Sequence, residues 1–245
     1  MAPDEPVDAF PPVERALRDP DGLLAIGGDL ACERLLSAYR QGIFPWFNPG
    51  QPVLWWSPDP RAVLFPAELH LSRSLRRNLK RQRFEFSIDE DFAAVIRACA
   101  TTPRRGKSEG AGGTWITDDM LAAYSELHAN GHAHSVEVRK NGRLVGGIYG
   151  VALGRVFFGE SMFSHEPDAS KAAMTLLIRE LIARGFGVLD CQVASAHLAT
   201  LGSREIPRRE FLQLLTRHAT PDTPARWQRS VEVRDLHDFD PANET

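Results

Sequence analysis

Hydrophobic and polar positions follow two different regimes along the chain, and the change falls near residue 66. Before it, Pro, Gly and Trp interrupt short apolar groups, and helical spacing is sustained only over 31–41, between Asp29 and Gly42. Beyond it, apolar residues recur with helical and strand spacing in alternation. The stretch 219–245 is polar, contains proline and is weakly periodic. We therefore expect a small irregular N-terminal domain over 1–66, a main domain over 67–218 and a loose tail over 219–245.

The main domain reads as alternating helices and strands. An Asn141-Gly142 turn predicts a hairpin between two of the strands, Asp89 and Thr117 are expected to cap helices, and strand–helix–strand at the end predicts a right-handed parallel crossover. Together these elements predict an α+β fold with a mixed sheet flanked by helices. The helices are expected over 72–83, 92–99, 120–130 and 169–184, and the strands over 84–88, 134–140, 143–152, 155–163 and 188–193.

Two of these strands carry polar residues where a buried strand is normally apolar. Asp190 and Gln192 alternate on one strand and are expected to share a face, as are Phe158, Glu160 and Met162 on the other. A carboxylate among Phe and Met has to be paired, hydrogen-bonded or protonated, because burial otherwise costs too much free energy. The pattern therefore predicts a functional site where the two strands meet.

Composition bounds the class of protein. The chain has 245 residues, a net charge of −3 and three widely spaced cysteines, which are typical of a reducing cytoplasm without disulfides. No run approaches eighteen apolar residues, and the acidic N-terminus lacks the apolar core of a secretory signal, so no membrane association is expected. His132 and His134 have no ligand partners nearby in sequence, so no metal site is expected.

Positive charge is concentrated between residues 71 and 84, although the whole chain is slightly acidic. No acidic residue interrupts this run, and an acidic stretch, 85–91, follows it. The asymmetry fits a surface that contacts phosphates, and it fits equally a solvated helix face. The basic residues are Arg73, Arg76, Arg77, Lys80, Arg81 and Arg83.

Eight motifs in fixed order resemble those of the leucyl/phenylalanyl-tRNA–protein transferases, and the match runs from about Phe10 to His218. The matching segments are 22–30 (GLLAIGGDL), 42–47 (GIFPWF), 54–61 (LWWSPDPR), 113–116 (GTWI), 132–137 (HAHSVE), 158–164 (FGESMFS), 190–192 (DCQ) and 201–208 (LGSREIPR).

The resemblance implies an enzyme of the N-degron pathway that moves Leu or Phe from an aminoacyl-tRNA to the N-terminal Lys or Arg of a protein. It implies a main domain like the GNAT acyltransferases and chemistry without an added cofactor or metal. A monomer suffices for this chemistry, so a monomer is expected. By resemblance, Asp190 and Gln192 deprotonate the acceptor α-amine, with Asp190 polarising Gln192. Glu160 holds either the acceptor's cationic end or the donor's aminoacyl end. A structural hydrogen-bonded pair and a structural buried carboxylate are the alternatives for these residues.

The same resemblance assigns residues to the two ends of the donor. Trp46 and Trp115 match tryptophans that stack around the terminal adenosine, and the basic run then contacts acceptor-stem phosphates. Domain packing is the alternative for the tryptophans. An apolar pocket discriminates poorly among Leu, Phe and Met, so overlapping donors, Met included, are expected. The expected pocket residues, each also compatible with ordinary core packing, are Ile148, Phe157, Met162, Leu177, Leu181 and Leu189, with Ser164 as a hydrogen-bonding neighbour.

Two other functions compete with this one. An acetyl-CoA-dependent N-acetyltransferase normally has a Gly-rich loop for pyrophosphate before the crossover helix, whereas 164–171 here contains no Gly and carries Glu166 and Asp168. A noncatalytic tRNA-binding module explains the basic run and the tryptophans, but not Glu160 beside Asp190 and Gln192.

Overall fold

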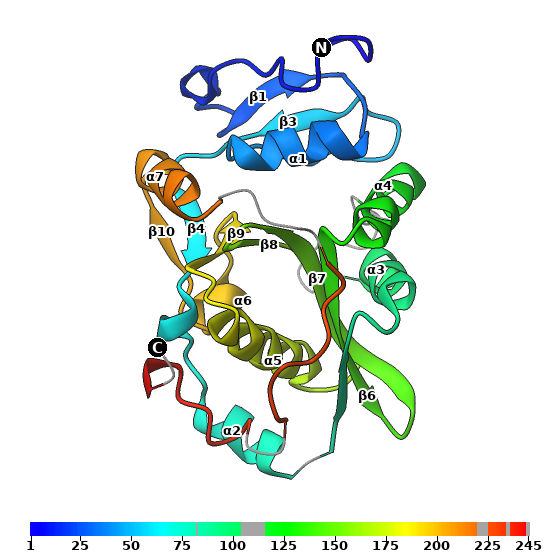
Figure 1. The fold of residues 1–245 in the computed structure, drawn as a ribbon, viewed down its shortest axis with the longest axis vertical. Helices are drawn as coiled ribbons and strands as arrows, with labels where there is room; N and C mark the ends of the chain where they lie inside the picture. Colours follow the sequence, from blue (N-terminus) through cyan, green and yellow to red (C-terminus); the bar gives the residue numbers. More distant parts are fainter. Residues whose placement is uncertain (82, 104–115, 220–224, 234–235, 244–245) are drawn as a thin grey trace.

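Two β-sheets and the helices around them make up the described part of the chain (Figure 1). The computed structural model describes residues 1–81, 83–103, 116–219, 225–233 and 236–243. The strands are β1 Leu23–Ile26, β2 Phe44–Pro45, β3 Leu54–Trp56, β4 Arg61–Leu64, β5 Glu85–Ile88, β6 Ala133–Lys140, β7 Arg143–Leu153, β8 Val156–Ser164, β9 Val188–Gln192 and β10 Arg204–Ile206. The α-helices are α1 Cys32–Arg40, α2 Arg73–Lys80, α3 Phe92–Thr101, α4 Asp118–Ala129, α5 Ala169–Ala183, α6 Ala196–Ala199 and α7 Arg208–His218.

The main sheet has seven strands in the order β10-β4-β9-β8-β7-β6-β5. Its neighbours are antiparallel except β8 and β9, which are parallel and joined through α5, as the crossover pattern predicted. The hairpin β6–β7 turns at Asn141 and Gly142, both at positive φ, which suits the favoured two-residue turn. The predicted α+β fold with a mixed sheet between helices is confirmed.

Each face of the sheet buries its own core. On one face α5 packs alanine and leucine side chains, Leu177 and Leu181 among them, against β4, β6, β8 and β9. On the other face α3 and α4 pack together with α1 of the N-terminal unit, so that Tyr39 and Tyr124 belong to one core. The N-terminal unit is therefore joined to the main domain by continuous hydrophobic packing, and the strand segment Phe158–Glu160 lies at this junction.

The N-terminal unit ends earlier than its composition predicts. Its three strands form a separate sheet in the order β1-β3-β2, with α1 beside it. Strand β4, by contrast, pairs with β9 and β10 inside the main sheet. The predicted boundary at residue 66 is therefore wrong by one strand, because Arg61–Leu64 is buried on both faces as a central strand and not as part of the irregular region.

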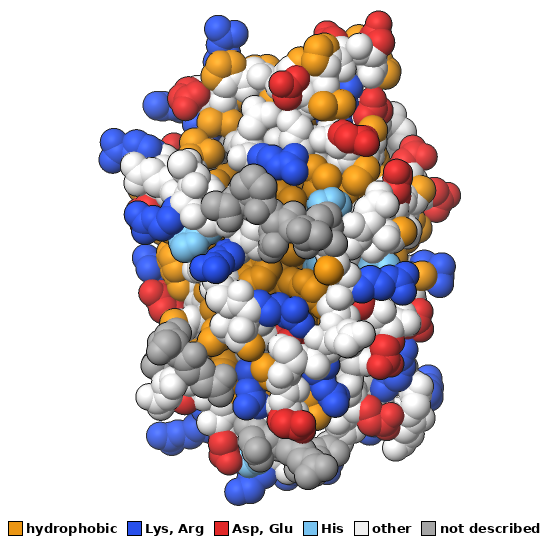
Figure 2. All heavy atoms as spheres, in the orientation of Figure 1, with side chains coloured by type: hydrophobic (Ala, Val, Ile, Leu, Met, Phe, Trp, Pro, Cys, Tyr) orange, Lys and Arg blue, Asp and Glu red, His pale blue; other side chains and the backbone are white. Residues whose placement is uncertain are grey.

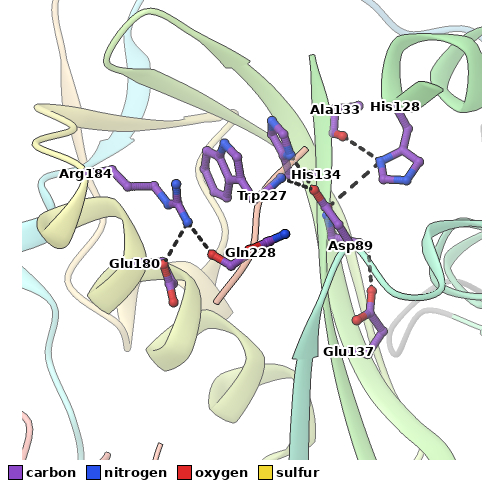
Figure 3. A network of polar contacts seen from close by, with 10 residues as sticks. Asp89, His128, Ala133, His134, Glu137, Glu180, Arg184, Trp227 and Gln228 are labelled. Atoms are coloured by element: carbon purple, nitrogen blue, oxygen red, sulfur yellow. Dashed lines mark hydrogen bonds and ion pairs between the residues drawn. The ribbon is translucent and has the colours of Figure 1, made fainter. Parts of the chain in front are cut away.

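Asp89 does not cap a helix as predicted. The side chain of Asp91 accepts the capping bond of α3 from the Ala94 N–H, whereas Asp89 takes a positive φ of 56°. Its carboxylate accepts instead from His134 Nδ1 at 2.8 Å, and from the main-chain N–H groups of Ser135 and Trp227 (Figure 3). The residue thus ties β6 to the C-terminal segment.

The described part of the C-terminal segment packs on the α5 face of the sheet and runs past α5 to α2 (Figure 1). The Trp227 ring stacks on His134, with centroids 4.0 Å apart and planes 11° apart. Glu180 of α5, fully buried, accepts from the main-chain N–H groups of Ser230 and Val231 at 2.7 and 3.1 Å. The prediction of a loose tail is wrong for these residues, because buried carboxylates of the main domain satisfy its backbone.

Within the described residues, no helix is long and apolar enough to cross a membrane.

Replacing Trp227 with Ala is expected to lower the free energy of unfolding by about 2 kcal/mol, because a half-buried aromatic side chain and its stacking on His134 are lost. Urea denaturation measures this change. The exposed neighbour gives the control, since Arg226→Ala should change stability by less than about 0.5 kcal/mol. Equal stability of the two variants would show that the segment contributes nothing to the fold.

Candidate functional site

A β-bulge places Glu160 at the junction of the two cores. Along β8 the partners of Gly159 and Ser161 on β7 are Gly150 and Tyr149, so Glu160 is the extra residue between them. A bulge shifts the alternation of side chains and re-aims one of them. Gly150 lies opposite, where a Cβ atom would fall 2.1 Å from the carbonyl oxygen of Phe158, so only glycine fits there.

The bulge also corrects the predicted alternation. Phe158 and Glu160 do point to the same side, toward Tyr39 and Tyr124, but Met162 packs against the core on the α5 side. The expectation that all three residues share a face is wrong, because the alternation rule assumes an unbulged strand. Glu160 and Met162 therefore border the same cavity from different sides of the sheet.

Glu160 is 8% exposed, and its carboxyl group lies among three polar side chains. Oε1 accepts from Tyr39 Oη at 2.7 Å and from Gln192 Nε2 at 3.0 Å, and Oε2 accepts from Tyr124 Oη at 2.9 Å. The two tyrosine hydroxyls also contact each other. Glu160 is consequently held by residues from α1, α4 and β9 at once.

The contacts among Tyr39, Tyr124 and Glu160 indicate whether Glu160 carries a proton. The ring formed by the two hydroxyls and the carboxyl group has three oxygen–oxygen contacts, and the two tyrosines supply one proton each. With a proton on Glu160 each contact has one: Glu160 then donates to one tyrosine, that tyrosine donates to the other, and the other donates back to Glu160. Burial raises the pKa of Glu160 from 4.5 to about 7, against the lowering effect of the hydrogen bonds from Tyr39, Tyr124 and Gln192. Near neutral pH this group can therefore hold or release a proton.

Asp190 is bound to an arginine. Arg61 donates from Nε to Oδ1 at 2.9 Å and from Nη2 to Oδ2 at 2.7 Å, and both side chains have no exposed surface. The guanidinium group lies between the rings of Phe44 and Phe211, at 4.8 and 4.6 Å from their centroids, and also donates to the carbonyl of Gly42. Asp190 is thus a buried, fully paired anion.

Gln192 connects the ion pair to Glu160. Its main-chain N–H donates to Asp190 Oδ1 at 2.9 Å, and its side-chain Nε2 donates to Glu160. Asp190 and Gln192 do project to one face, but the expected bond between their side chains is replaced by one to the main chain of Gln192. The residue has a φ of 64°, which ends the regular strand and turns the amide toward Glu160. Asp190 therefore fixes the position of Gln192 through its main chain, without contacting its side-chain amide.

Glu160 and Gln192 line a cavity of about 1040 Å³ that opens where β8 and β9 part. Four residues of the predicted pocket, Ile148, Met162, Ser164 and Leu189, line it as well. The other three, Phe157, Leu177 and Leu181, are buried in the core beneath α5 and do not reach the cavity lining. Leu177 and Leu181 lie on α5 and Phe157 lies on β8, and neither helix nor strand spacing alone separates a core position from a position on the cavity wall.

The expected tRNA-binding residues fall into two places. Trp46 lies at the cavity with 41% of its surface exposed, whereas Trp115 lies outside the described residues. Helix α2 adjoins the cavity, because its Asn78 bonds to the cavity residue Asp168. Five of the six basic residues are exposed, but Arg76 donates to the carbonyls of His237 and Phe239 and holds the C-terminal segment. Figure 2 shows positive and negative side chains interspersed over one face, without an extended area of one sign.

Three residues of the site were absent from the sequence predictions. Tyr124 occurs in a helix whose buried side is otherwise apolar, Tyr39 shares the buried side of α1 with Arg34 and apolar residues, and Arg61 occurs in a strand that is otherwise Ala-Val-Leu. A polar side chain on the buried side of an amphipathic element signals an internal hydrogen bond. Which residue satisfies each of them depends on contacts 36 to 129 positions apart, which one sequence does not reveal.

Glu160→Gln is expected to make stability less dependent on pH. In the wild type the unfolded chain ionises Glu160 near pH 4.5 and the folded chain near 7, so the contribution of Glu160 to stability is greatest below 4.5 and falls by up to about 3 kcal/mol as the pH rises past 7. Gln cannot ionise, so the variant should gain on the wild type by up to that amount between pH 5 and pH 8 in urea titrations. Glu126→Gln, at an exposed site on α4, should show no such trend. Parallel pH profiles for wild type and Glu160→Gln would contradict the raised pKa.

Most of the sequence matches one family of known proteins. The profile of the leucyl/phenylalanyl-tRNA protein transferase family matches residues 63–216, and that of its N-terminal domain matches 28–59. Curated leucyl/phenylalanyl-tRNA–protein transferases from Azotobacter vinelandii and Thiobacillus denitrificans are 58% and 57% identical over 219 residues, 89% of this chain and 95% and 94% of theirs. A solved ribosomal-protein-alanine N-acetyltransferase from Brucella melitensis has a TM-score of 0.34 at 16% identity, covering 61% of this chain and 97% of its own. The chain belongs to the leucyl/phenylalanyl-tRNA protein transferase family.

Proposed function

We propose that this protein transfers Leu or Phe, and to some extent Met, from aminoacyl-tRNA to the N-terminal Lys or Arg of acceptor proteins, and so marks them for the N-degron pathway. The observation that supports the proposal is the hydrogen-bonded pair Glu160–Gln192, which lines a large cavity. The buried Arg61–Asp190 ion pair positions Gln192 through its main chain. The names of the relatives, "leucyl/phenylalanyl-tRNA–protein transferase", supply the reaction. A cytoplasmic monomer without added cofactor or metal is part of the proposal.

The reaction is the aminolysis of an ester. The acceptor α-amine attacks the carbonyl carbon of the aminoacyl group, a C–N bond forms, the bond to the 3′ oxygen of the tRNA breaks, and the amine proton ends on that oxygen. The enzyme's part is to present a neutral amine in the right direction. Because Gln192 Nε2 is bound to Glu160, its Oε1 is free to accept a hydrogen bond from the amine in the cavity.

Glu160 takes up the excess proton of an arriving ammonium group. A pKa of about 7 lies close to the value of an ordinary α-amino group, so transfer between the two has little thermodynamic cost. Asp190, paired to Arg61, keeps its charge and orients Gln192 through the main chain. In this arrangement Glu160 handles the proton, Gln192 aligns the amine, and Asp190 acts as a positioning residue.

The donor side chain enters the apolar part of the cavity. Ile148, Met162 and Leu189 line it, with Met174 of α5 behind them. Such a surface offers no polar group by which to separate Leu, Phe and Met, and size alone discriminates by about 1–3 kcal/mol per methylene. Flexible Met side chains further allow residues of different shape to fit.

The adenosine and the acceptor stem bind at the outer end of the cavity. The exposed ring of Trp46 offers a stacking surface for the terminal base, with Trp115 as a second candidate, and α2 beside Asp168 offers cations to the phosphates. The cavity residue Asp168 suits a basic acceptor side chain, whereas Glu166 is already paired with Lys140 at 3.0 Å, and both carboxylates weigh against the pyrophosphate of CoA.

Gln192→Ala is expected to lower kcat/KM for transfer at least about 100-fold, because the amine loses its alignment. The assay offers Leu-, Phe- and Met-tRNA with peptides that differ in their first residue, and counts aminoacylated product. Stability should fall by only about 1 kcal/mol, since one hydrogen bond is lost. Gln213→Ala, at an exposed position of α7, is the control. Absence of transfer from any of the three tRNAs by the wild type would refute the proposed function, and near-normal transfer by Gln192→Ala would refute the role of this residue.

Arg77→Glu with Arg81→Glu is expected to weaken aminoacyl-tRNA binding at least about tenfold and to flatten its salt dependence. With fewer cations on the protein, binding releases fewer counterions from the tRNA. These two are exposed, whereas Arg76 is engaged with the C-terminal segment and would confuse binding with stability. Arg209→Glu with Arg217→Glu reverses the same charge on the exposed side of α7. Equal affinity of both double variants would exclude α2 from the contact.

A further inference from the structure

Helix α2 has a buried side, two flanks and an exposed side. Leu75 and Leu79 are buried in the core on the α5 face of the sheet. At about 100° per residue, Arg76 and Asn78 lie on the two flanks of this buried side, about 80° from it in opposite directions. The side that faces away from the core carries the exposed cations Arg73, Arg77 and Lys80.

Each flank of α2 is bonded to another part of the chain. Arg76 Nη1 donates to the main-chain carbonyls of His237 and Phe239, at 3.0 and 2.9 Å. On the opposite flank, Asn78 Nδ2 donates to Asp168 Oδ2, which precedes α5 and lines the cavity. Apolar packing has no preferred direction, so the two leucines alone restrict rotation of the helix about its axis only weakly. Hydrogen bonds on opposite flanks fix that rotation.

The C-terminal residues that Arg76 binds are themselves held in place. Leu236 and Phe239 are each 2% exposed and belong to the core on the α5 face. Beyond them, the turn η3 Pro241–Asn243 lies beside the turn η2 Pro66–Glu68, which precedes α2 (Figure 1). The segment 236–243 therefore holds α2 at one flank and adjoins the turn that leads into it.

We propose that Arg76 is a positioning residue for the donor. Together with the segment 236–243 it fixes the rotation of α2, so that the exposed cations of this helix face the acceptor-stem phosphates of the aminoacyl-tRNA. This rests on the proposed function, in which α2 binds those phosphates. The sequence grouped Arg76 with the phosphate-contacting cations, because a run of basic residues does not show which partner each one has in the fold.

Direct contact between Arg76 and a phosphate is the alternative. Arg77 and Lys80 are exposed on the outer side of α2, whereas Arg76 is half-buried on a flank and already donates to two main-chain carbonyls. A cation that contacts tRNA has to be open to the solvent from which the tRNA arrives. The placement of Arg76 therefore favours a role through the C-terminal segment.

Phe239→Ala tests the positioning role without changing a charge or a residue of α2. Loss of the buried ring releases the main chain that Arg76 binds. The KM for aminoacyl-tRNA is expected to rise at least about threefold and its salt dependence to flatten, because α2 no longer presents its cations to the phosphates together. At saturating aminoacyl-tRNA, kcat should change less than about twofold.

Matched variants separate positioning from a loss of stability and from direct contact. Trp227→Ala destabilises the same segment at β6, away from α2, and should leave the KM and its salt dependence unchanged. Arg76→Gln should raise the KM as Phe239→Ala does, and the double variant should be no worse than either single variant, since both break one contact. Arg76→Lys should behave like Arg76→Gln, because its ammonium group ends about one bond short of the Nη1 position.

The outcomes distinguish this inference from the proposed function. A wild-type KM and salt dependence in Phe239→Ala overturn the positioning role, as do losses in Arg76→Gln and Phe239→Ala that add. Tighter binding by Phe239→Ala also overturns it, because the segment would then screen α2. If Phe239→Ala does not fold, Arg76→Lys decides, since a near-wild-type KM would show direct phosphate contact and a KM equal to that of Arg76→Gln supports positioning.

The double variant Arg77→Glu with Arg81→Glu tests the premise separately. Unchanged binding by this variant refutes the phosphate contact of α2 in the proposed function, and the positioning role with it. Weakened binding by this variant, combined with wild-type behaviour of Phe239→Ala, refutes the positioning role alone.

Discussion

The buried ion pair between Arg61 and Asp190 is the interaction on which the rest of the site depends. Two charges without exposed surface are stable together only if their hydrogen bonds are satisfied, and removing either partner leaves the other uncompensated at a cost of about 3–5 kcal/mol. Arg61 is satisfied by the carboxylate, the Gly42 carbonyl and the faces of Phe44 and Phe211. These groups come from the N-terminal unit, α7 and β9, so the pair fixes three parts of the chain around one point.

The ion pair between Arg61 and Asp190 also determines where β8 and β9 separate in the sheet. Asp190 is the last residue of β9 that pairs with β8, and its Oδ1 holds the main chain of Gln192 as that chain turns aside. On the other strand the bulge at Glu160 turns a carboxyl group toward the same point. The buried Asp190 carboxylate and the bulge in β8 together hold Gln192 Nε2 3.0 Å from Glu160 Oε1 at the base of the cavity. The site is thus built from departures from regular strand geometry.

This explains which features the sequence could predict. Periodicity identified the long helices, the β6–β7 hairpin and the parallel crossover, because each depends on residues close together in the chain. It also singled out Glu160, Asp190 and Gln192, since polar residues in buried strands violate the pattern. It missed the bulge, the partners of these groups and the membership of β4 in the main sheet. Arg61 and Asp190 are 129 positions apart, and nothing local in either segment encodes their meeting. The C-terminal segment was misjudged for the same reason, because its stability comes from Glu180 and Asp89 and not from its own composition.

The two carboxyl groups of the site have different hydrogen-bond partners, and the proposed chemistry depends on that difference. Both oxygens of Asp190 are engaged by the Arg61 guanidinium group and the Gln192 main chain, so Asp190 holds backbone and arginine in place and does not contact a substrate. Glu160 is buried and faces only neutral donors, and its pKa lies about where a substrate amine's does. Had both been left with neutral partners, their repulsion would have driven one to protonate and loosened the strand ends. One fixed and one exchangeable carboxyl group, separated by a glutamine that contacts both, is the arrangement that lets a rigid site move a proton.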